Sequence, residues 1–170
     1  MSGNWRPIGH PYQTLFNPTN QCRLVSEWAR TGVRRSLACY PWYVDAKAGD
    51  IVVSERDNHR LQIFDFLGGE TRFQPQGCCG TSKNQFIRPC GVTTTNLPGV
   101  NVICADSGNR RVVFMKVQSD YYGNGILDTS MTFGNQTFDE PMGLEHDTVR
   151  NYLVVTDTGK RKITLNDMRD

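Results

Sequence analysis

The stretch DSGNRR, residues 106–111, decides the fold because the chain writes nearly the same six letters three times. ERDNHR fills residues 55–60, and DTGKRK fills residues 157–162. Each stretch therefore begins 51 residues after the one before it, at 55, 106 and 157. A constant offset of this length indicates a structural repeat, so we expect an array of equivalent units.

The residues around the middle copy predict four short β-strands joined by turns. Apolar and β-branched residues, which favour strands, alternate with Gly, Pro and Asn, which favour turns. Gly108 lies in a tight turn and, as a glycine, is able to take a positive φ. Four strands in about 50 residues, without helical periodicity, are typical of one blade of a β-propeller. The predicted strands span residues 89–95, 100–106, 110–117 and 126–133.

The other two copies predict equivalent strands. A linker motif is also repeated, since NQFIRPCGV at 84–92 matches QTFDEPMGL at 136–144. Pro89 and Pro141 in this motif suit the first position of a strand, where the sheet needs no N–H group. The predicted strands span 51–55, 59–66 and 70–74 in the first copy, and 151–157 and 161–167 in the third.

These motifs resemble the NHL repeat, a β-propeller blade. VICADSGNRRVVF at 102–114 follows the family's pattern of an apolar run, Asp, a turn with Asn and Arg, and a second apolar run. QFIRPCGV matches its pattern between blades, and the first copy carries Asn58, His59 and Leu61. The resemblance implies an all-β fold, a partial β-propeller of four-stranded antiparallel NHL blades that forms about half of a six-bladed ring.

The expected boundaries divide the chain into five parts. They are an N-terminal extension at 1–11, a half blade with the third and fourth strands at 12–34, blades at 35–84 and 85–135, and a blade at 136–170 that lacks its fourth strand. A half ring would leave apolar blade faces uncovered, which invites association. We expect either self-association of two copies to complete a propeller or a fragment of a longer protein.

The repeated polar residues are expected to be structural. Short acidic and amide side chains can bond backbone N–H groups at a hairpin, and the following Arg can pair with the acid. Lys replaces Asn and Arg at 160 and 162, which puts those bonds in doubt in the third copy. The structural set contains Glu55, Asn58, Arg60, Asp106, Asn109, Arg111, Asp157 and Lys162.

The resemblance implies an interaction module rather than an enzyme. In tripartite-motif NHL proteins the propeller binds protein or RNA, and a separate RING domain carries ubiquitin-ligase activity. This chain has no RING-type array of Cys and His, so we expect protein binding, with RNA binding as the alternative. Basic residues near the hairpins could contact phosphates, and two loop tyrosines could stack on bases. The candidates are Arg56, His59, Arg110, Lys160, Arg161, Tyr121 and Tyr122.

Catalysis is the minor alternative, through the resemblance to peptide-amidating lyases that hold a metal with histidines. His10, His59 and His146 fall at unrelated repeat positions, so no ligand set is predicted. We therefore expect no cofactor and no metal.

Composition and charge favour a cytoplasmic protein with no membrane partner. The net charge of +2 implies no strong field, and the six cysteines contain no CxxC pair. Cys39, Cys90 and Cys104 lie in apolar runs and are expected to be buried thiols, with a secreted disulfide framework as the alternative. The start of the chain lacks a signal-peptide pattern, and the sequon at Asn135 would matter only in a secreted protein.

Overall fold

The computed structural model describes residues 38, 40–47, 50–65, 77–98, 101–119, 125–134 and 137–169. These residues form antiparallel β-sheets and one short 3-10 turn, Ser107–Asn109. The all-β class predicted from the sequence is confirmed. In the same ranges, no helix has the length and apolar character needed to cross a membrane.

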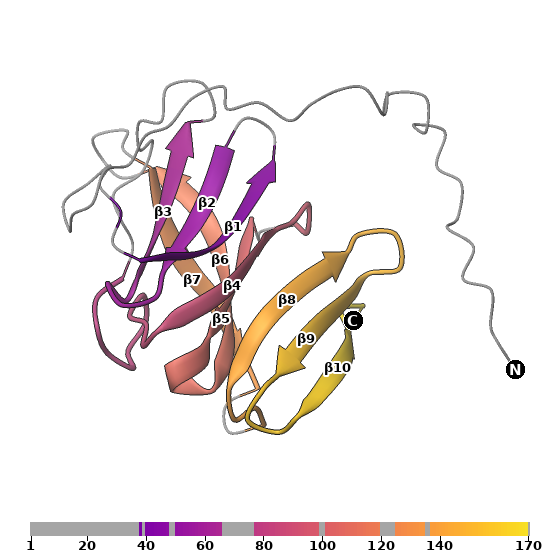
Figure 1. Ribbon diagram of the computed structural model, residues 1–170. Helices are drawn as coiled ribbons and strands as arrows, with labels where there is room; N and C mark the ends of the chain where they lie inside the picture. Colours follow the sequence, from indigo (N-terminus) through magenta and orange to yellow (C-terminus); the bar gives the residue numbers. More distant parts are fainter. Residues whose placement is uncertain are drawn as a thin grey trace, which may run out of the picture.

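Three sheets follow one another along the chain (Figure 1). The first sheet contains β1 (Pro41–Lys47), β2 (Asp50–Glu55) and β3 (Arg60–Asp65). The middle sheet contains β4 (Pro89–Thr94), β5 (Val102–Asp106), β6 (Arg111–Ser119) and β7 (Gly125–Phe133). The last sheet contains β8 (Pro141–Asp147), β9 (Tyr152–Asp157) and β10 (Lys162–Asp167). Neighbouring strands in each sheet are consecutive in the chain.

The predicted strands match the observed ones with ends shifted by no more than two residues. The exception is the strand predicted at 70–74, which lies outside the described residues, as do the segments 1–11 and 12–34. Both linker prolines begin a strand, as predicted, and β1 begins with a third proline. Each of these prolines is paired with the acid of its repeat: Pro41 with Glu55, Pro89 with Asp106, and Pro141 with Asp157.

The first two hairpin connections of each sheet differ in how much their lengths vary from sheet to sheet. The connection from the second strand to the third is always four residues, at 56–59, 107–110 and 158–161. The connection from the first strand to the second spans 48–49, 95–101 and 148–151. Length is thus constant at the end of the sheet that carries the six-letter repeat and variable at the opposite end.

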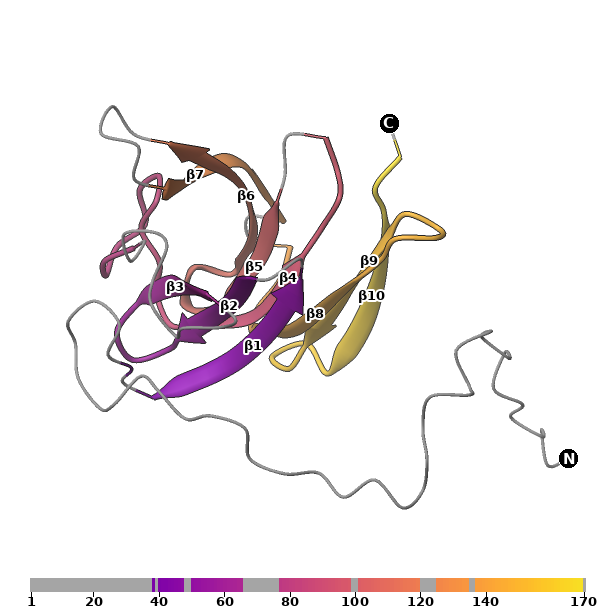
Figure 2. The same ribbon diagram turned by 90° about the horizontal axis from the view of Figure 1, so that it is seen from above.

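The first strands β1, β4 and β8 lie side by side, so the sheets are arranged as neighbours (Figure 2). Polar side chains join these strands. Asp45 Oδ2 accepts hydrogen bonds from Thr94 N at 2.6 Å and from Thr94 Oγ1 at 2.7 Å. Thr95 Oγ1 lies 3.0 Å from His146 Nδ1, and His146 is buried. His146 thus joins β8 to the segment that follows β4.

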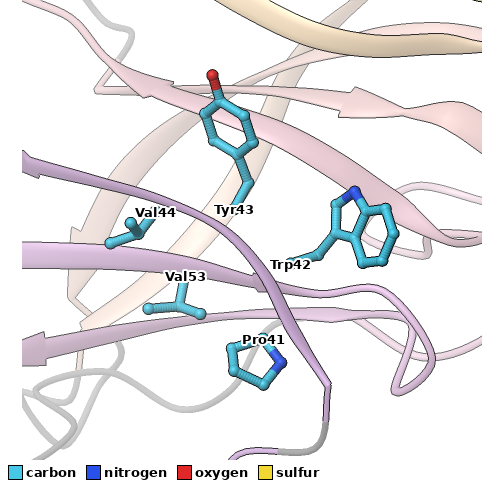
Figure 3. A pocket seen from close by; sticks show the side chains of 5 residues that line it. All are labelled: Pro41, Trp42, Tyr43, Val44 and Val53. Atoms are coloured by element: carbon cyan, nitrogen blue, oxygen red, sulfur yellow. The ribbon is translucent and has the colours of Figure 1, made fainter.

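The strands β1 and β10 expose apolar side chains. Trp42 and Val44 are 52% and 59% exposed, and Ile163 and Leu165 are 72% and 65% exposed. Four residues of β1 and one of β2 line an open pocket of about 360 Å³, namely Pro41, Trp42, Tyr43, Val44 and Val53 (Figure 3).

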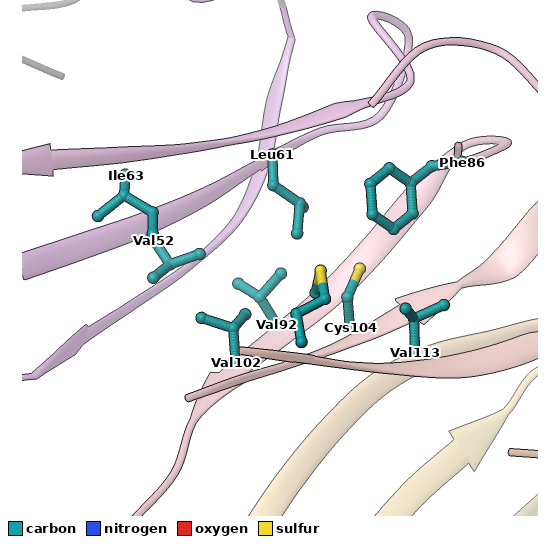
Figure 4. Close-up of a cluster of buried hydrophobic side chains, with 9 residues drawn as sticks. Val52, Leu61, Ile63, Phe86, Val92, Val102, Cys104 and Val113 are labelled. Atoms are coloured by element: carbon teal, nitrogen blue, oxygen red, sulfur yellow. The ribbon is translucent and has the colours of Figure 1, made fainter. Parts of the chain in front are cut away.

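In the middle sheet, in contrast, β5, nearly all of β4 and the first half of β6 are buried on both faces. One face packs against the first sheet around Val102, Cys104, Val113 and Met115, as shown in Figure 4. Successive residues of a strand point to opposite faces, so a second set faces the last sheet. This set contains Ile103, Ala105, Val112 and Phe114. All five residues of β5 are buried, which explains why the strand reads as a continuous apolar run.

Candidate functional site

The repeated hairpins place three of the predicted binding residues in the same backbone conformation. His59, Arg110 and Arg161 have φ values of 53°, 58° and 53°, in the left-handed region that favours glycine. Arg110 follows His59, and Arg161 follows Arg110, by the repeat length of 51 residues. In each sheet a basic residue therefore occupies the left-handed position directly before the third strand.

Gly108 does not use the positive φ that a glycine can take, and the residue with a positive φ is Arg110. The reason is that residues 107–109 form a 3-10 turn, so the left-handed residue comes one position after the turn. Gly108 is needed for close packing. A Cβ atom there would lie 2.4 Å from Ile87 Cγ2 and 2.6 Å from Ile87 O. The small residue thus lets the hairpin approach the linker, where Gly108 N donates to Ile87 O at 2.8 Å.

In the middle repeat the predicted structural residues form one network around a fully buried Asp106. Asp106 Oδ2 accepts hydrogen bonds from Asn109 Nδ2 and Arg111 Nε, both at 2.8 Å, and its Oδ1 accepts from Ile87 N at 2.8 Å. Arg111 also donates to the carbonyl oxygens of Thr81 and Gln85, both at 2.9 Å. The network therefore ties the hairpin to the preceding linker.

The first repeat has the same design with a longer acid. Glu55 is fully buried, and its Oε2 accepts a hydrogen bond from Arg60 Nε at 3.1 Å. Asn58 and Gln62 also donate to its carboxylate.

The third repeat satisfies its acid in another way. Asp157 accepts hydrogen bonds from the backbone N–H groups of Asp139 at 3.0 Å, Glu140 at 2.9 Å and Lys160 at 3.2 Å. Lys160 Nζ donates to Thr137 O, and Lys162 is exposed. Among the described residues, no side chain donates to Asp157, so the doubt about the third copy was justified.

The networks of the middle and third repeats shift the pKa of their acids in opposite directions. Burial raises the pKa of Asp106, although hydrogen bonds from Asn109, Ile87 and Arg111 oppose it. Burial also acts to raise the pKa of Asp157, but the three backbone N–H groups outweigh it and hold the pKa below its ordinary value.

A polar groove of about 270 Å³ lies where two of these hairpins meet two linkers. Arg56 comes from the hairpin of the first sheet, and the hairpin of the middle sheet supplies Arg110. Arg88 and Glu140 each precede the proline of a linker motif. The lining residues are Arg56, Arg88, Ser107, Gly108, Arg110, Asp139 and Glu140.

Two of the three groove arginines already have partners. Arg110 Nη2 lies 3.1 Å from Asp139 Oδ1. Arg56 Nη1 lies 3.2 Å from Asp57 Oδ1, and its guanidinium carbon lies 5.0 Å from the centre of the Trp42 ring. The exposed side chain of Arg88 and the half-buried side chain of Glu140 make no hydrogen bond or ion pair with any described residue. The groove thus offers one unpaired cation and one unpaired anion.

The predicted binding residues are only partly brought together. Arg56 and Arg110 line the groove. His59 lies beside it, where its Nδ1 accepts a hydrogen bond from Arg88 N at 3.0 Å. Lys160 and Arg161 belong to the hairpin of the last sheet and do not line the groove, and Tyr121 and Tyr122 lie outside the described residues.

Three residues of the groove were not predicted from the sequence: Arg88, Asp139 and Glu140. The available signal was the linker motif, because Arg88 and Glu140 directly precede its prolines.

The structure describes two of the three cysteines that were predicted to be buried. Cys90 and Cys104 are buried, as predicted, and burial raises the pKa of both thiols, whereas Cys78 and Cys79 are exposed. Cys39 lies outside the described residues.

Within the described ranges no group of three or more His, Cys, Asp or Glu residues is arranged to hold a metal ion.

Comparison with known proteins supports the repeat in the first sheet. A family model described as NHL repeat matches residues 39–64, a segment that includes β1 and β2 and ends one residue before the end of β3. No curated protein matches the chain.

Two solved structures match the chain at low sequence identity. The first, from Bacteroides thetaiotaomicron VPI-5482, is provisionally described as a phosphatase and is 17% identical, with a TM-score of 0.50. The second, from Bacteroides fragilis NCTC 9343, is provisionally described as an exported protein and is 12% identical, with a TM-score of 0.49. The similarity covers 72% and 84% of this chain but only 33% and 41% of those chains, so this chain spans well under half of either. The chain thus contains an NHL repeat match in its first sheet and shares only a fold with the first of these two proteins.

Proposed function

We propose that this chain is part of an NHL-type β-propeller and acts as a non-catalytic module that binds a protein partner through the polar groove. Three neighbouring sheets with equivalent hairpins, and the NHL repeat match at 39–64, support the propeller part of the proposal. In a tripartite-motif-like ubiquitin ligase or another regulatory protein, such a module would select the partner, and any ligase activity would come from a RING domain elsewhere.

One observation carries the choice of partner: Arg88 and Glu140 line the same groove, and neither is paired with a described residue. A groove that offers one charge of each sign is complementary to a peptide with both signs. Charged groups that are complementary across an interface provide specificity. The constant hairpins hold the groove in place, so the site is formed before the partner arrives.

RNA fits the groove less well. Asp139 and Glu140 would lie close to any phosphate bound by Arg88, and like charges repel. Arg110 is already paired with Asp139, so its charge is partly neutralised. RNA binding therefore remains the alternative, to be separated by experiment.

The test begins with the selection of random dodecapeptides on the immobilised chain. We expect enriched peptides that carry both acidic and basic residues. Their affinity, measured by fluorescence anisotropy, should fall at least about tenfold in Arg88→Ala, since a charged contact at an interface contributes about 2 kcal/mol or more. Lys162→Ala is the matched control, because Lys162 is exposed and lies outside the groove.

Three outcomes would contradict the proposal. Selection could enrich no peptide, or the enriched peptides could bind Arg88→Ala as tightly as the parent. A random RNA pool could also bind in a filter assay with a steep salt dependence that Arg88→Ala reduces, which would favour RNA.

A further inference from the structure

The two linkers that line the polar groove carry different side chains at equivalent positions. Ile87 and Arg88 precede the proline of the first linker, which joins the first sheet to the middle sheet. Asp139 and Glu140 precede the proline of the second linker, which joins the middle sheet to the last. An apolar residue and a cation in one linker are thus replaced by two acids in the other. Both carboxylates that line the groove come from the second linker.

The fold needs the backbone of these two acids and not their charges. Asp139 N and Glu140 N donate to the buried carboxylate of Asp157 at 3.0 Å and 2.9 Å. In the first linker, Ile87 N makes the same junction with Asp106 at 2.8 Å. Because Ile87 does this without a charged side chain, the junction does not require an acid at the equivalent position. The carboxylates of Asp139 and Glu140 are therefore available for another role.

The carboxylate of Asp139 is held in a fixed place within the groove. It lies over Gly159, where an added Cβ atom would be 2.5 Å from Asp139 Oδ2. Ile87 lies over Gly108 in the same way in the middle repeat. Asp139 Oδ1 lies 3.1 Å from Arg110 Nη2, which belongs to the hairpin of the middle sheet. The fixed carboxylate therefore offsets the charge of one of the groove's cations.

The two acids leave the groove with little net charge. Its lining contains three arginines and two acids, a net charge of +1. A nucleic-acid strand binds through several phosphates, each of which is neutralised by a cation. Two carboxylates among the arginines would repel these phosphates, and like charges across an interface suppress the wrong partner. Without the two carboxylates the groove would present Arg56, Arg88 and Arg110.

We infer that Asp139 and Glu140 determine which class of ligand the groove accepts, because their carboxylates reject polyanions such as single-stranded RNA. Once both side chains are neutral, the same three arginines form a phosphate-binding site. This inference rests on the proposed function for the location of the site. It assigns the selectivity of that site to two side chains of one linker.

The experiment measures the binding of a fluorescein-labelled oligouridine by fluorescence anisotropy at about 50 and about 200 mM salt. The groove variant Asp139→Asn/Glu140→Gln keeps the shape of both side chains and removes their charges. We expect it to bind at least about tenfold more tightly than the parent at the lower salt, because repulsion is removed and Arg110 is released. The slope of log affinity against log salt should steepen by about 0.7 for each phosphate newly neutralised.

The matched control is Asp147→Asn/Asp167→Asn, which changes the net charge of the chain by the same amount. These acids are paired with Arg150 at 2.9 Å and with Arg169 at 2.6 Å, so the control also releases cations. Both acids end their strands, at the end of the sheets opposite the groove. The control should therefore gain much less affinity for the oligouridine than the groove variant.

Two further variants make the result specific. Adding Arg88→Ala to the groove variant should abolish its gain, because the groove then loses a phosphate contact. Glu140→Gln alone should gain affinity in the same direction by a smaller factor. The Glu140 side chain makes no hydrogen bond or ion pair with any described residue, so this variant keeps the fold even if the double variant does not. Each variant is accepted only if its far-ultraviolet circular dichroism matches the parent's.

The outcomes separate this inference from the proposed function. No gain in the groove variant and in Glu140→Gln, or an equal gain in the control, would overturn the inference and leave peptide binding untouched. A gain in the groove variant, with no peptide enriched on the parent, would support the inference and contradict the proposed function. Tight binding of the oligouridine by the parent would overturn both.

Discussion

The hairpins of the middle and last sheets have nearly the same six residues and the same backbone turn, yet they stabilise their acids by different groups. Asp106 accepts hydrogen bonds from the side chains of Asn109 and Arg111, which belong to its own repeat, and from one backbone N–H group. Among the described residues, Asp157 accepts hydrogen bonds only from backbone N–H groups, and two of these groups belong to the linker. The acid and the turn are common to both, and the Asn and Arg are not.

This difference indicates which part of the repeat the fold requires. In both sheets the acid joins the hairpin to the linker, through Ile87 N in one and through Asp139 N and Glu140 N in the other. An unpaired buried N–H group or carboxylate would be costly, so this junction must be satisfied. The Arg of the middle repeat adds a second junction to the same linker, which the last repeat lacks.

The largest expected effect comes from removing that Arg. Arg111→Ala should lower the free energy of unfolding by about 3 kcal/mol, because it leaves Asp106 buried without its ion pair and removes the donor of three carbonyl oxygens. The equivalent Lys162→Ala should change it by less than about 0.5 kcal/mol, since Lys162 is exposed. Urea denaturation of both variants checks the difference, and equal effects would show that the two hairpins do not differ as described.

The second largest expected effect is a difference in how the stability contributed by each of the two acids depends on pH. Asp157→Asn should cost about 1–2 kcal/mol at pH 7, because the carboxylate loses charge-assisted hydrogen bonds. Since the folded pKa of Asp157 is below its unfolded value, its stabilisation is present above the unfolded pKa of about 3.9 and is lost as the pH falls through the folded pKa. The cost of Asp157→Asn should therefore shrink in acid.

Asp106→Asn should show the opposite slope. The folded pKa of Asp106 is raised, so the folded state binds more protons than the unfolded state between the two pKa values. The parent then loses stability as the pH rises through this window, and the cost of Asp106→Asn should shrink with it. Unfolding curves of both variants from pH 3 to pH 7 give the two slopes, and slopes of the same sign would refute the contrast.

The smallest effect concerns the left-handed residues that the two hairpins share. Arg161→Gly should raise the free energy of unfolding by about 0.5 kcal/mol, because glycine removes the strain of a positive φ at some cost in chain entropy. Arg110→Gly should gain less, since it also loses the ion pair with Asp139. Thermal unfolding compares the two, and a loss of stability in Arg161→Gly would show that its side chain contributes more than the turn.

The sequence was sufficient for the features that repeat and insufficient for those that join different repeats. The strands, the linker prolines and the buried acids follow from local pattern, as Pro89 and Asp106 show. The groove could not be predicted, because Arg88 meets Arg56 and Glu140 only after three segments from different repeats come together. The left-handed position was missed because the hairpin geometry places it at Arg110, where no glycine marks it.

The unequal hairpin lengths at the two ends of each sheet offer a route to engineered reporters. The connections at 95–101 and 148–151 have different lengths in otherwise equivalent sheets, so added residues there need not disturb the strand pairing. An epitope or a small fluorescent label inserted after Val149, which is 87% exposed, would sit at the end of the sheets opposite the groove. The four-residue connections have no such freedom, and an insertion there would separate each acid from its linker.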